Sequence, residues 1–370
     1  MSINALLNKY QQSPRLFQLA DKLSFALTNG RGQKIYLQNL RGSSSQFVAA
    51  SIFLHPSCSS LNHVFICNEP EDAAYFHNTL ENLTDALNIF YFPSSFKNRK
   101  NYRLLNSSHV MLRTEAMTKF SAQSGNRVGA LVTYPEALFE KVVVPNAISS
   151  SIIHLKAGDE IQPDSLFEKL VGYGFERTDF VYEPGQFAVR GGILDIYSFG
   201  NDKPYRIELF GNDIDSIRII DPETQLSERR LLQVSIIPNV DSQFEDEEKV
   251  SLLEFLPENT VIWIQDEELL KERLLTSEED LRLFLDLHAS SPKKEEEDTE
   301  DKLVKKDIRP DEFVTADDFF QHLQQKHTVH FGHQRPGNEV LEITFNTRQQ
   351  PAFNRQFDLL IRDLNEWEKK

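Results

Sequence analysis

The chain has 370 residues, enough for roughly two or three domains that each bury a core of their own. A hydrophobic fraction of 40 % and a charged fraction of 26 % are typical of a globular protein, and 27 phenylalanines indicate aromatic-rich cores or an exposed contact surface. The formal net charge of −16 argues against nucleic-acid binding by the chain as a whole, because that contact needs clustered lysine and arginine. A local basic patch is still compatible with this composition.

The cysteines and the N-terminus indicate the compartment. Cys58 and Cys67 lie in or beside a predicted buried strand, which favours neither a disulfide framework nor a cysteine zinc site. The first 23 residues lack the basic start, apolar block and cleavage site of a signal peptide, and no apolar run approaches the length of about 18 residues that spans a membrane. These features predict a reducing, cytoplasmic location without membrane contact.

The first part of the chain alternates between helix and strand patterns. Residues 6–28 carry apolar positions at helical spacing, and Gly30 and Gly32 follow where such a helix would stop. Residues 30–145 then predict an α/β domain with a mainly parallel sheet. Its predicted strands cover 34–40, 63–68, 89–92 and 129–134, and its predicted helices cover 43–54, 70–87 and 106–122.

From about residue 152 the hydrophobic period changes to two. Strand patterns cover 186–199, 204–210 and 213–221, and Gly-Asn-Asp clusters beginning at Gly200 and Gly211 separate them. This spacing predicts an antiparallel meander, with a helix before it at 164–175. Together they predict a small α+β domain.

The last third returns to the first pattern, with a predicted buried strand at 260–266 and a long helix at 267–287. The segment 290–306 is dense in both charges and almost free of apolar residues, which predicts an acidic, solvated loop or helix extension; a binding tail is a remote alternative. The predicted organisation is therefore an α/β domain at 1–151, an inserted α+β domain at 152–237, and a second α/β part at 238–370 that returns to the first.

The loop after the first predicted strand is where a nucleotide-binding α/β protein holds phosphates, on the amides that open the next helix. A phosphate loop needs G-x-x-x-x-G-K-[ST], with the lysine on the β- and γ-phosphates and the hydroxyl on magnesium. The sequence here is NLRGSSSQF. With Gly42 placed inside that frame, Asn39 stands at the first glycine, Ser44 at the second glycine, Ser45 at the lysine and Gln46 at the hydroxyl. We therefore expect a degenerate, non-binding loop, in which Ser43 or Ser44 has the alternative role of a helix cap.

No pattern predicts a catalytic or metal site. His327, His330 and His333 invite a zinc hypothesis, but strand positions three apart point to opposite faces, which favours surface and strand histidines instead. No spacing stands out among the 56 acidic residues, and neither a Ser-His-Asp elbow nor a glycine-rich dinucleotide fingerprint occurs. We expect no catalytic residue and no metal.

The meander carries the most informative side chains. Alternation in YRIELF places Tyr205, Ile207 and Leu209 on the core side. Arg206, Glu208 and Phe210 then lie on the other side. In QFAVRGG the same rule turns Phe187 and Val189 inward and Arg190 outward. If these strands pair, Arg190, Arg206 and Phe210 form one patch suited to an acidic protein partner. The alternative is that Arg190 pairs with Glu208 while another segment covers Phe210, and the pattern alone does not decide between them.

The stretch from YEPGQFAVRGG to TQLS, at 182–227, closely resembles the signature of the second domain of bacterial transcription-repair coupling factors. That domain is itself similar to the UvrA-binding domain of the excision-repair protein UvrB. Weaker agreement covers LRGSSSQF, the exit VTYPEALFEKVVVP and the return IIPNVD.

The resemblance implies a UvrB-like module: a degenerate helicase-like (RecA-like) domain that has lost its ATP site, and an inserted domain that recruits UvrA for nucleotide excision repair. The family's UvrA-contacting residues fall on Arg190, Arg206 and Phe210. UvrB itself keeps an intact phosphate loop and a β-hairpin for DNA, so the departures in the loop favour the coupling factor.

Complete members of that family add a domain that contacts RNA polymerase, a DNA-translocating motor that uses ATP and magnesium, and a C-terminal domain that masks the UvrA surface. We accordingly expect an N-terminal fragment that has no cofactor of its own, binds UvrA directly, and meets RNA polymerase and DNA through other domains. Two alternatives stay open: a working UvrB-like ATPase and damage-recognition protein, or a structural module whose patch is closed by intramolecular contacts.

Overall fold

The computed structural model describes residues 3–29, 32–84, 88–98, 100–121, 129–144, 150–199, 201, 203–238, 249–289, 308–337, 339–348 and 356–368. Within these ranges the strands form a seven-stranded sheet, a six-stranded sheet and three two-stranded ribbons. The predicted acidic loop at 290–306 lies outside the described residues. No helix in the described ranges is both long and apolar enough to cross a membrane.

The large sheet is parallel throughout. Its strand order is β19-β1-β18-β17-β2-β6-β3, and every neighbouring pair runs in the same direction. The central strands are buried on both faces, which is why they read as continuous apolar runs in the sequence. The strands are β1 (Lys34–Gln38), β2 (Asn62–Ile66), β3 (Ile89–Tyr91), β6 (Ala130–Thr133), β17 (Thr260–Ile264), β18 (His327–His330) and β19 (Leu341–Thr344).

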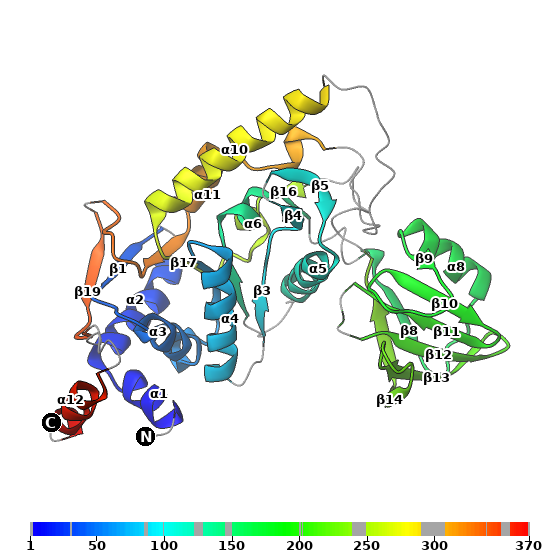
Figure 1. Ribbon diagram of the computed structural model, residues 1–370, viewed down its shortest axis with the longest axis horizontal. Coiled ribbons are helices and arrows are strands. Elements are labelled where there is room, and N and C mark those ends of the chain that lie inside the picture. The colour runs from blue at the N-terminus through cyan, green and yellow to red at the C-terminus, as the bar shows by residue number, and fades with distance from the viewer. Residues whose placement is uncertain are drawn as a thin grey trace.

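Helices surround this sheet, and Figure 1 shows the longest, α10, beside α11. The predicted helix over 6–28 is wrong in one respect, because two helices cover it: α1 ends at Gln11 and α2 begins at Pro14, whose missing N–H suits a first helical position. The helices are α1 (Ile3–Gln11), α2 (Pro14–Asn29), α3 (Ser44–Phe53), α4 (Pro70–Thr84), α5 (Ser107–Ser121), α6 (Pro135–Phe139), α9 (Leu252–Phe255), α10 (Glu267–Ala289), α11 (Ala316–Leu323) and α12 (Phe357–Glu368), with short 3₁₀ turns at Pro56–Cys58 and Pro310–Glu312.

The chain leaves and re-enters the large unit at one antiparallel ribbon. Strand β7 (Val142–Val143) pairs with β16 (Lys249–Val250), and the residues between them contain the small unit. Beside the ribbon, Lys249 Nζ forms a buried ion pair with Glu312 at 2.6 Å. Another ribbon of the large unit pairs β4 (Phe96–Asn98) with β5 (Asn101–Leu105).

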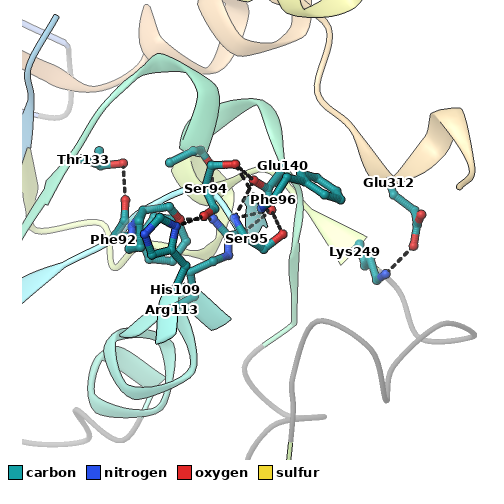
Figure 2. A network of polar contacts seen from close by, with 12 residues as sticks. Phe92, Ser94, Ser95, Phe96, His109, Arg113, Thr133, Glu140, Lys249 and Glu312 are labelled. Carbon is teal, nitrogen blue, oxygen red and sulfur yellow. Dashed lines mark hydrogen bonds and ion pairs between the residues drawn. The ribbon is translucent and has the colours of Figure 1, made fainter. Parts of the chain in front are cut away.

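A buried polar network fixes the segment that precedes this exit (Figure 2). The Glu140 carboxylate accepts hydrogen bonds from the Ser94 hydroxyl at 2.6 Å and the Ser95 amide at 2.9 Å. Arg113, fully buried, lies 3.5 Å from the same carboxylate and stacks over the Phe92 ring at 4.2 Å. Because each buried charge has a partner here, the network holds the loop after β3 against the segment that leads into the small unit.

The small unit is the predicted antiparallel meander. Its sheet has the order β14-β13-β12-β11-β10-β9, with antiparallel pairs from β10 to β14. The predicted strand at 186–199 is two strands joined at Gly191-Gly192. The elements are β9 (Glu176–Arg177), β10 (Gln186–Arg190), β11 (Ile193–Ile196), β12 (Tyr205–Phe210), β13 (Asp213–Ile220) and β14 (Ser227–Leu231), with helix α8 (Pro163–Gly172) and the ribbon of β8 (Ile153–Lys156) with β15 (Gln233–Ile236).

The two sheets confirm the predicted fold class, an α/β unit built on a parallel sheet with an inserted α+β unit built on an antiparallel meander. Strands of the large sheet come from both sides of the small unit in the chain, namely β1 to β6 before it and β17 to β19 after it. The exact domain boundaries at 151 and 237 stay a prediction.

Candidate protein-binding site

One side of the six-stranded sheet carries the charged residues singled out in the sequence. The strand register places Asp195 opposite Arg206, while the alternating residues Phe187, Tyr205 and Ile207 are buried on the other side. This confirms the predicted alternation. We call this side the outer face, defined by Arg190, Asp195, Arg206, Glu208, Arg218 and Arg230.

Asp195 is the centre of the outer face. Its carboxylate is fully buried and accepts two hydrogen bonds from Arg206, from Nε at 2.8 Å and from Nη2 at 2.8 Å. This bidentate geometry is the strongest form of arginine–carboxylate pairing, and the hydrogen bond to Asp195 raises the pKa of Arg206 above its usual value. Arg206 Nη1 also donates to the Gln225 carbonyl at 3.1 Å, so only 15 % of its side chain is exposed.

Arg190 binds the same carboxylate. Its Nη2 pairs with Asp195, its Nη1 donates to the Asp179 carbonyl at 2.6 Å, and its guanidinium lies 4.7 Å from the centre of the Phe180 ring. The side chain remains 31 % exposed. The alternative in which Arg190 pairs with Glu208 is wrong, since Arg190 pairs with Asp195 and Glu208 pairs with Arg218.

The two guanidinium groups are therefore held in place by one buried carboxylate, whereas the sequence predicted side chains projecting freely into solvent. Asp195 is the residue that sequence reasoning missed. The available signal was an acidic residue within the apolar strand ILDI, because a buried carboxylate needs a partner.

Phe210 is 83 % exposed, the most exposed large apolar side chain of the described residues. It ends β12 beside the turn Gly211-Asn212. The preceding residue, Leu209, donates its amide to the Gly192 carbonyl at 2.7 Å, which brings the end of β12 against the turn that follows Arg190. Phe210 and Arg190 thus flank the same end of the sheet, and Arg206 lies four residues back along β12, about 13 Å away at 3.3 Å per residue.

Two loops lie at the other end of the outer face, one between β9 and β10 (residues 178–185) and one between β13 and β14 (residues 221–226). A small apolar cluster, separate from the main core, consists of Val181, Ala188, Tyr197 and Ile220. Gln225 joins the loops, because its Nε2 donates to the Val181 carbonyl at 3.0 Å. Its own carbonyl is the one that accepts from Arg206, so loop packing and guanidinium position are coupled.

The degenerate phosphate loop makes contacts within the chain. Gly42 adopts the left-handed backbone conformation at φ 56°. The Arg41 amide donates both to the Ser44 hydroxyl at 2.8 Å and to the Thr347 hydroxyl at 3.0 Å. Ser45 donates to Gln46 at 3.0 Å. The predicted side-chain cap is wrong for Ser43, which occupies the N-cap position of α3 without a capping hydrogen bond; its ψ near 0° is not the extended geometry of a cap.

The three histidines do not converge. His327 and His330 are both buried on β18, and His333 follows the strand and contacts Arg41 Nη1 at 3.1 Å. Burial lowers the pKa of His330 to about 3, with Lys34 as a smaller cause. In the described ranges no group of three or more His, Cys, Asp or Glu residues is arranged to hold a metal ion.

Comparison with known proteins finds matches that include the small unit. The UvrB interaction domain family matches residues 153–241. The chain is 37 % identical over 130 residues to the transcription-repair-coupling factor of Bacillus subtilis (strain 168), covering 35 % of this chain and 11 % of that protein. It is 36 % identical over 119 residues to that of Myxococcus xanthus, covering 32 % and 10 %, and 28 % identical over 110 residues to that of Escherichia coli (strain K12), covering 30 % and 10 %.

These matches confirm the resemblance to the UvrB-like module of transcription-repair coupling factors that the sequence predicted. They span about a tenth of the length of each relative.

Proposed function

We propose that the chain is a docking module that binds UvrA through the outer face of its UvrB interaction domain and so brings nucleotide excision repair to a stalled transcription complex. One observation carries the proposal: the ring of Phe210, which is 83 % exposed, shares the outer face with two guanidinium groups that Asp195 already holds in position. Exposed aromatic and arginine residues are the side chains that contribute most to protein–protein affinity.

The arrangement of Arg190, Arg206 and Phe210 suits the binding of a protein partner better than it suits catalysis. Asp195 removes most of the rotamer freedom of Arg190 and Arg206 before a partner arrives, which lowers the entropy lost on association. Both arginines keep N–H groups that Asp195 does not use, since each guanidinium carries five donors. A carboxylate of UvrA can share these donors while Phe210 fills a pocket, so that the arginines fix orientation and the ring supplies apolar burial.

The large parallel sheet acts in this proposal as a scaffold without its own nucleotide site. The Arg41 amide, in the loop between β1 and α3, donates to the Ser44 and Thr347 hydroxyls. The positions of the lysine and the hydroxyl are held by Ser45 and Gln46. A UvrB-like ATPase would need those groups, and no observation favours that alternative.

The wider role follows from the family. We propose that this module belongs to a cytoplasmic coupling factor in which a motor domain uses ATP and magnesium to move on DNA and displace stalled RNA polymerase. A C-terminal domain of that protein covers the outer face until the motor engages. RNA polymerase and DNA would then be partners of other domains, and UvrA the partner of this chain.

The test is a titration of the purified chain with its cognate UvrA, measured by biolayer interferometry. We expect saturable binding that Phe210→Ala weakens by about 5- to 150-fold, the equivalent of about 1 to 3 kcal/mol. Tyr75→Ala is the control, because Tyr75 is also an exposed aromatic residue, at 62 %, but lies on α4 of the large unit. Undiminished binding by folded Phe210→Ala would contradict the assignment.

A further inference from the structure

Three arginines occupy directly paired positions on neighbouring strands of the outer face. Arg206 on β12 lies opposite Arg218 on β13, and Arg218 lies opposite Arg230 on β14. Asp195 on β11 begins the same row on the other side of Arg206. We call Arg206, Arg218 and Arg230 the arginine row.

Such a row is unfavourable for the fold alone. Directly opposed residues of antiparallel strands have Cβ atoms about 4.5 to 5.5 Å apart, and like charges at that distance destabilise the sheet. The arginine row therefore needs negatively charged partners. The chain provides fewer of them toward Arg230, which lies on the edge strand β14 and which we call the open end of the row.

The pairing weakens from the centre of the sheet to its edge. Arg206 has the bidentate contact with Asp195, and Arg218 has a single contact of 3.2 Å with Glu208. Arg230 Nη2 donates to the Asp215 backbone carbonyl at 3.3 Å, and no carboxylate in the described part of the chain forms an ion pair with it. The exposed fraction of the side chain is 15 % for Arg206 and 38 % for Arg218, and Arg230 is exposed.

We propose that Arg218 and Arg230 extend the docking site, so that a carboxylate-bearing segment of UvrA lies across the strands along the arginine row. This rests on the proposed function and adds to it the path and the charge of the bound segment. Arg206 supplies the fixed end of the path, and Arg230 supplies the least compensated charge at its open end. The segment would replace the counterions that the chain lacks.

The surroundings favour an acidic protein segment over a nucleic-acid backbone. Glu208, 30 % exposed, stands on the same face beside the row, and Glu228, 41 % exposed, lies on β14. A uniformly negative phosphate backbone would be repelled by these carboxylates and by the net charge of −16, whereas a protein surface can place carboxylates between them. The exposed ring of Phe210 at the end of β12 likewise suits a protein pocket.

The chain offers a matched control on the same strand. Arg229 is adjacent to Arg230 and equally charged, but it pairs with Ile219 and therefore points to the opposite side of the sheet. Arg230→Glu and Arg229→Glu change the net charge of the chain by the same amount on the same edge strand. A difference in UvrA affinity between the two variants therefore shows on which side of the sheet UvrA binds, because their net charge is the same.

The experiment measures cognate UvrA binding to both variants and to Arg218→Gln at two salt concentrations, with circular dichroism to verify folding. We expect Arg230→Glu to weaken UvrA binding about tenfold at low salt and less at high salt, Arg218→Gln to weaken it several-fold, and Arg229→Glu to change it less than twofold. Equal effects of Arg229→Glu and Arg230→Glu, or no effect of Arg230→Glu, would overturn the proposal.

Two outcomes separate this proposal from the one it rests on. If the wild-type chain does not bind UvrA, the proposed function itself fails. If the wild type binds, Phe210→Ala weakens binding and the row variants do not, only the row proposal fails. A duplex DNA probe is titrated in parallel, and DNA affinity lost in Arg230→Glu with unchanged UvrA affinity would assign the row to nucleic acid and overturn the proposal.

Discussion

The Asp195 carboxylate accepts two hydrogen bonds of 2.8 Å from the Arg206 guanidinium, and Asp195 itself is fully buried. The same carboxylate also pairs with Arg190, which comes from the neighbouring strand β10. One side chain thus fixes two predicted contact residues on different strands. The outer face is therefore held in place at Arg190 and Arg206, and it is exposed at the ring of Phe210.

Replacing Asp195 with asparagine should lower both stability and partner affinity. The amide cannot neutralise two guanidinium groups and offers one oxygen in place of two, so we expect a loss of about 2 to 4 kcal/mol in the free energy of unfolding. Urea denaturation measures the loss. Asp215→Asn, an exposed carboxylate on β13, is the control and should change stability by less than about 0.5 kcal/mol. Equal stability of the two variants would show that the buried pairing contributes nothing to the fold.

Alanine substitutions at the two glycines between β10 and β11 should lower the stability of the protein by different amounts. A Cβ at Gly192 would lie 2.7 Å from the Leu209 carbonyl oxygen, a backbone atom that cannot move without disturbing the β12 pairing. At Gly191 a Cβ would meet open space, but φ of 62° costs an alanine about 1 kcal/mol. We expect Gly192→Ala to destabilise the chain more than Gly191→Ala in urea denaturation, and the reverse order would contradict this account of the turn.

Stability should fall as the pH drops below 6.5, in part through His63. Trp263 Nε1 donates to His63 Nδ1 at 3.0 Å, and burial lowers the pKa of His63 to about 3. The unfolded chain takes up this proton near pH 6.5 and the folded chain does not, so stability present above pH 6.5 is lost progressively toward pH 3, by at most about 1.4 kcal/mol per pH unit for each such histidine.

His63→Gln, which keeps an acceptor for Trp263, should reduce the slope of unfolding free energy against pH over this window. The slope should not vanish, because burial also lowers the pKa of His330 to about 3. His154→Gln, at an exposed strand position, serves as the control. An unchanged slope in a folded His63→Gln variant would rule out His63 as a source of the acid sensitivity.

The chain should not bind nucleotide. Calorimetric titration with millimolar ATP and magnesium is expected to show no saturable heat, since the Arg41 amide is used by Ser44 and Thr347 and the lysine position holds Ser45. Saturable binding or turnover would instead support the UvrB-like ATPase.

Much of the fold follows from local sequence signals. Apolar runs predicted the buried parallel strands, and period-two alternation predicted both the meander and the burial of Tyr205 and Ile207. The division of the first helix at Pro14 was available from the sequence but was outweighed by the apolar spacing around it.

The site was less predictable, because it depends on strand register. The place of Asp195 within the apolar run ILDI indicates a buried carboxylate, but the local pattern does not show that Arg190 and Arg206 are its partners. The arginine row depends on a bulge between Ile219 and Ile220 and on the turns that set each pairing. Contacts such as that of Thr347 with Arg41 join residues about 300 positions apart, which periodicity cannot detect.

Site-specific photo-crosslinking tests the central claim most directly. A benzophenone amino acid replaces Phe210 in one variant and Tyr75, on α4 of the large unit, in another, and each is irradiated with cognate UvrA. Both positions are exposed, at 83 % and 62 %, so reactivity reports proximity to the partner. We predict a covalent UvrA adduct from position 210 and none from position 75. An adduct from position 75 alone, or none from position 210 while the complex forms, would contradict docking through the outer face.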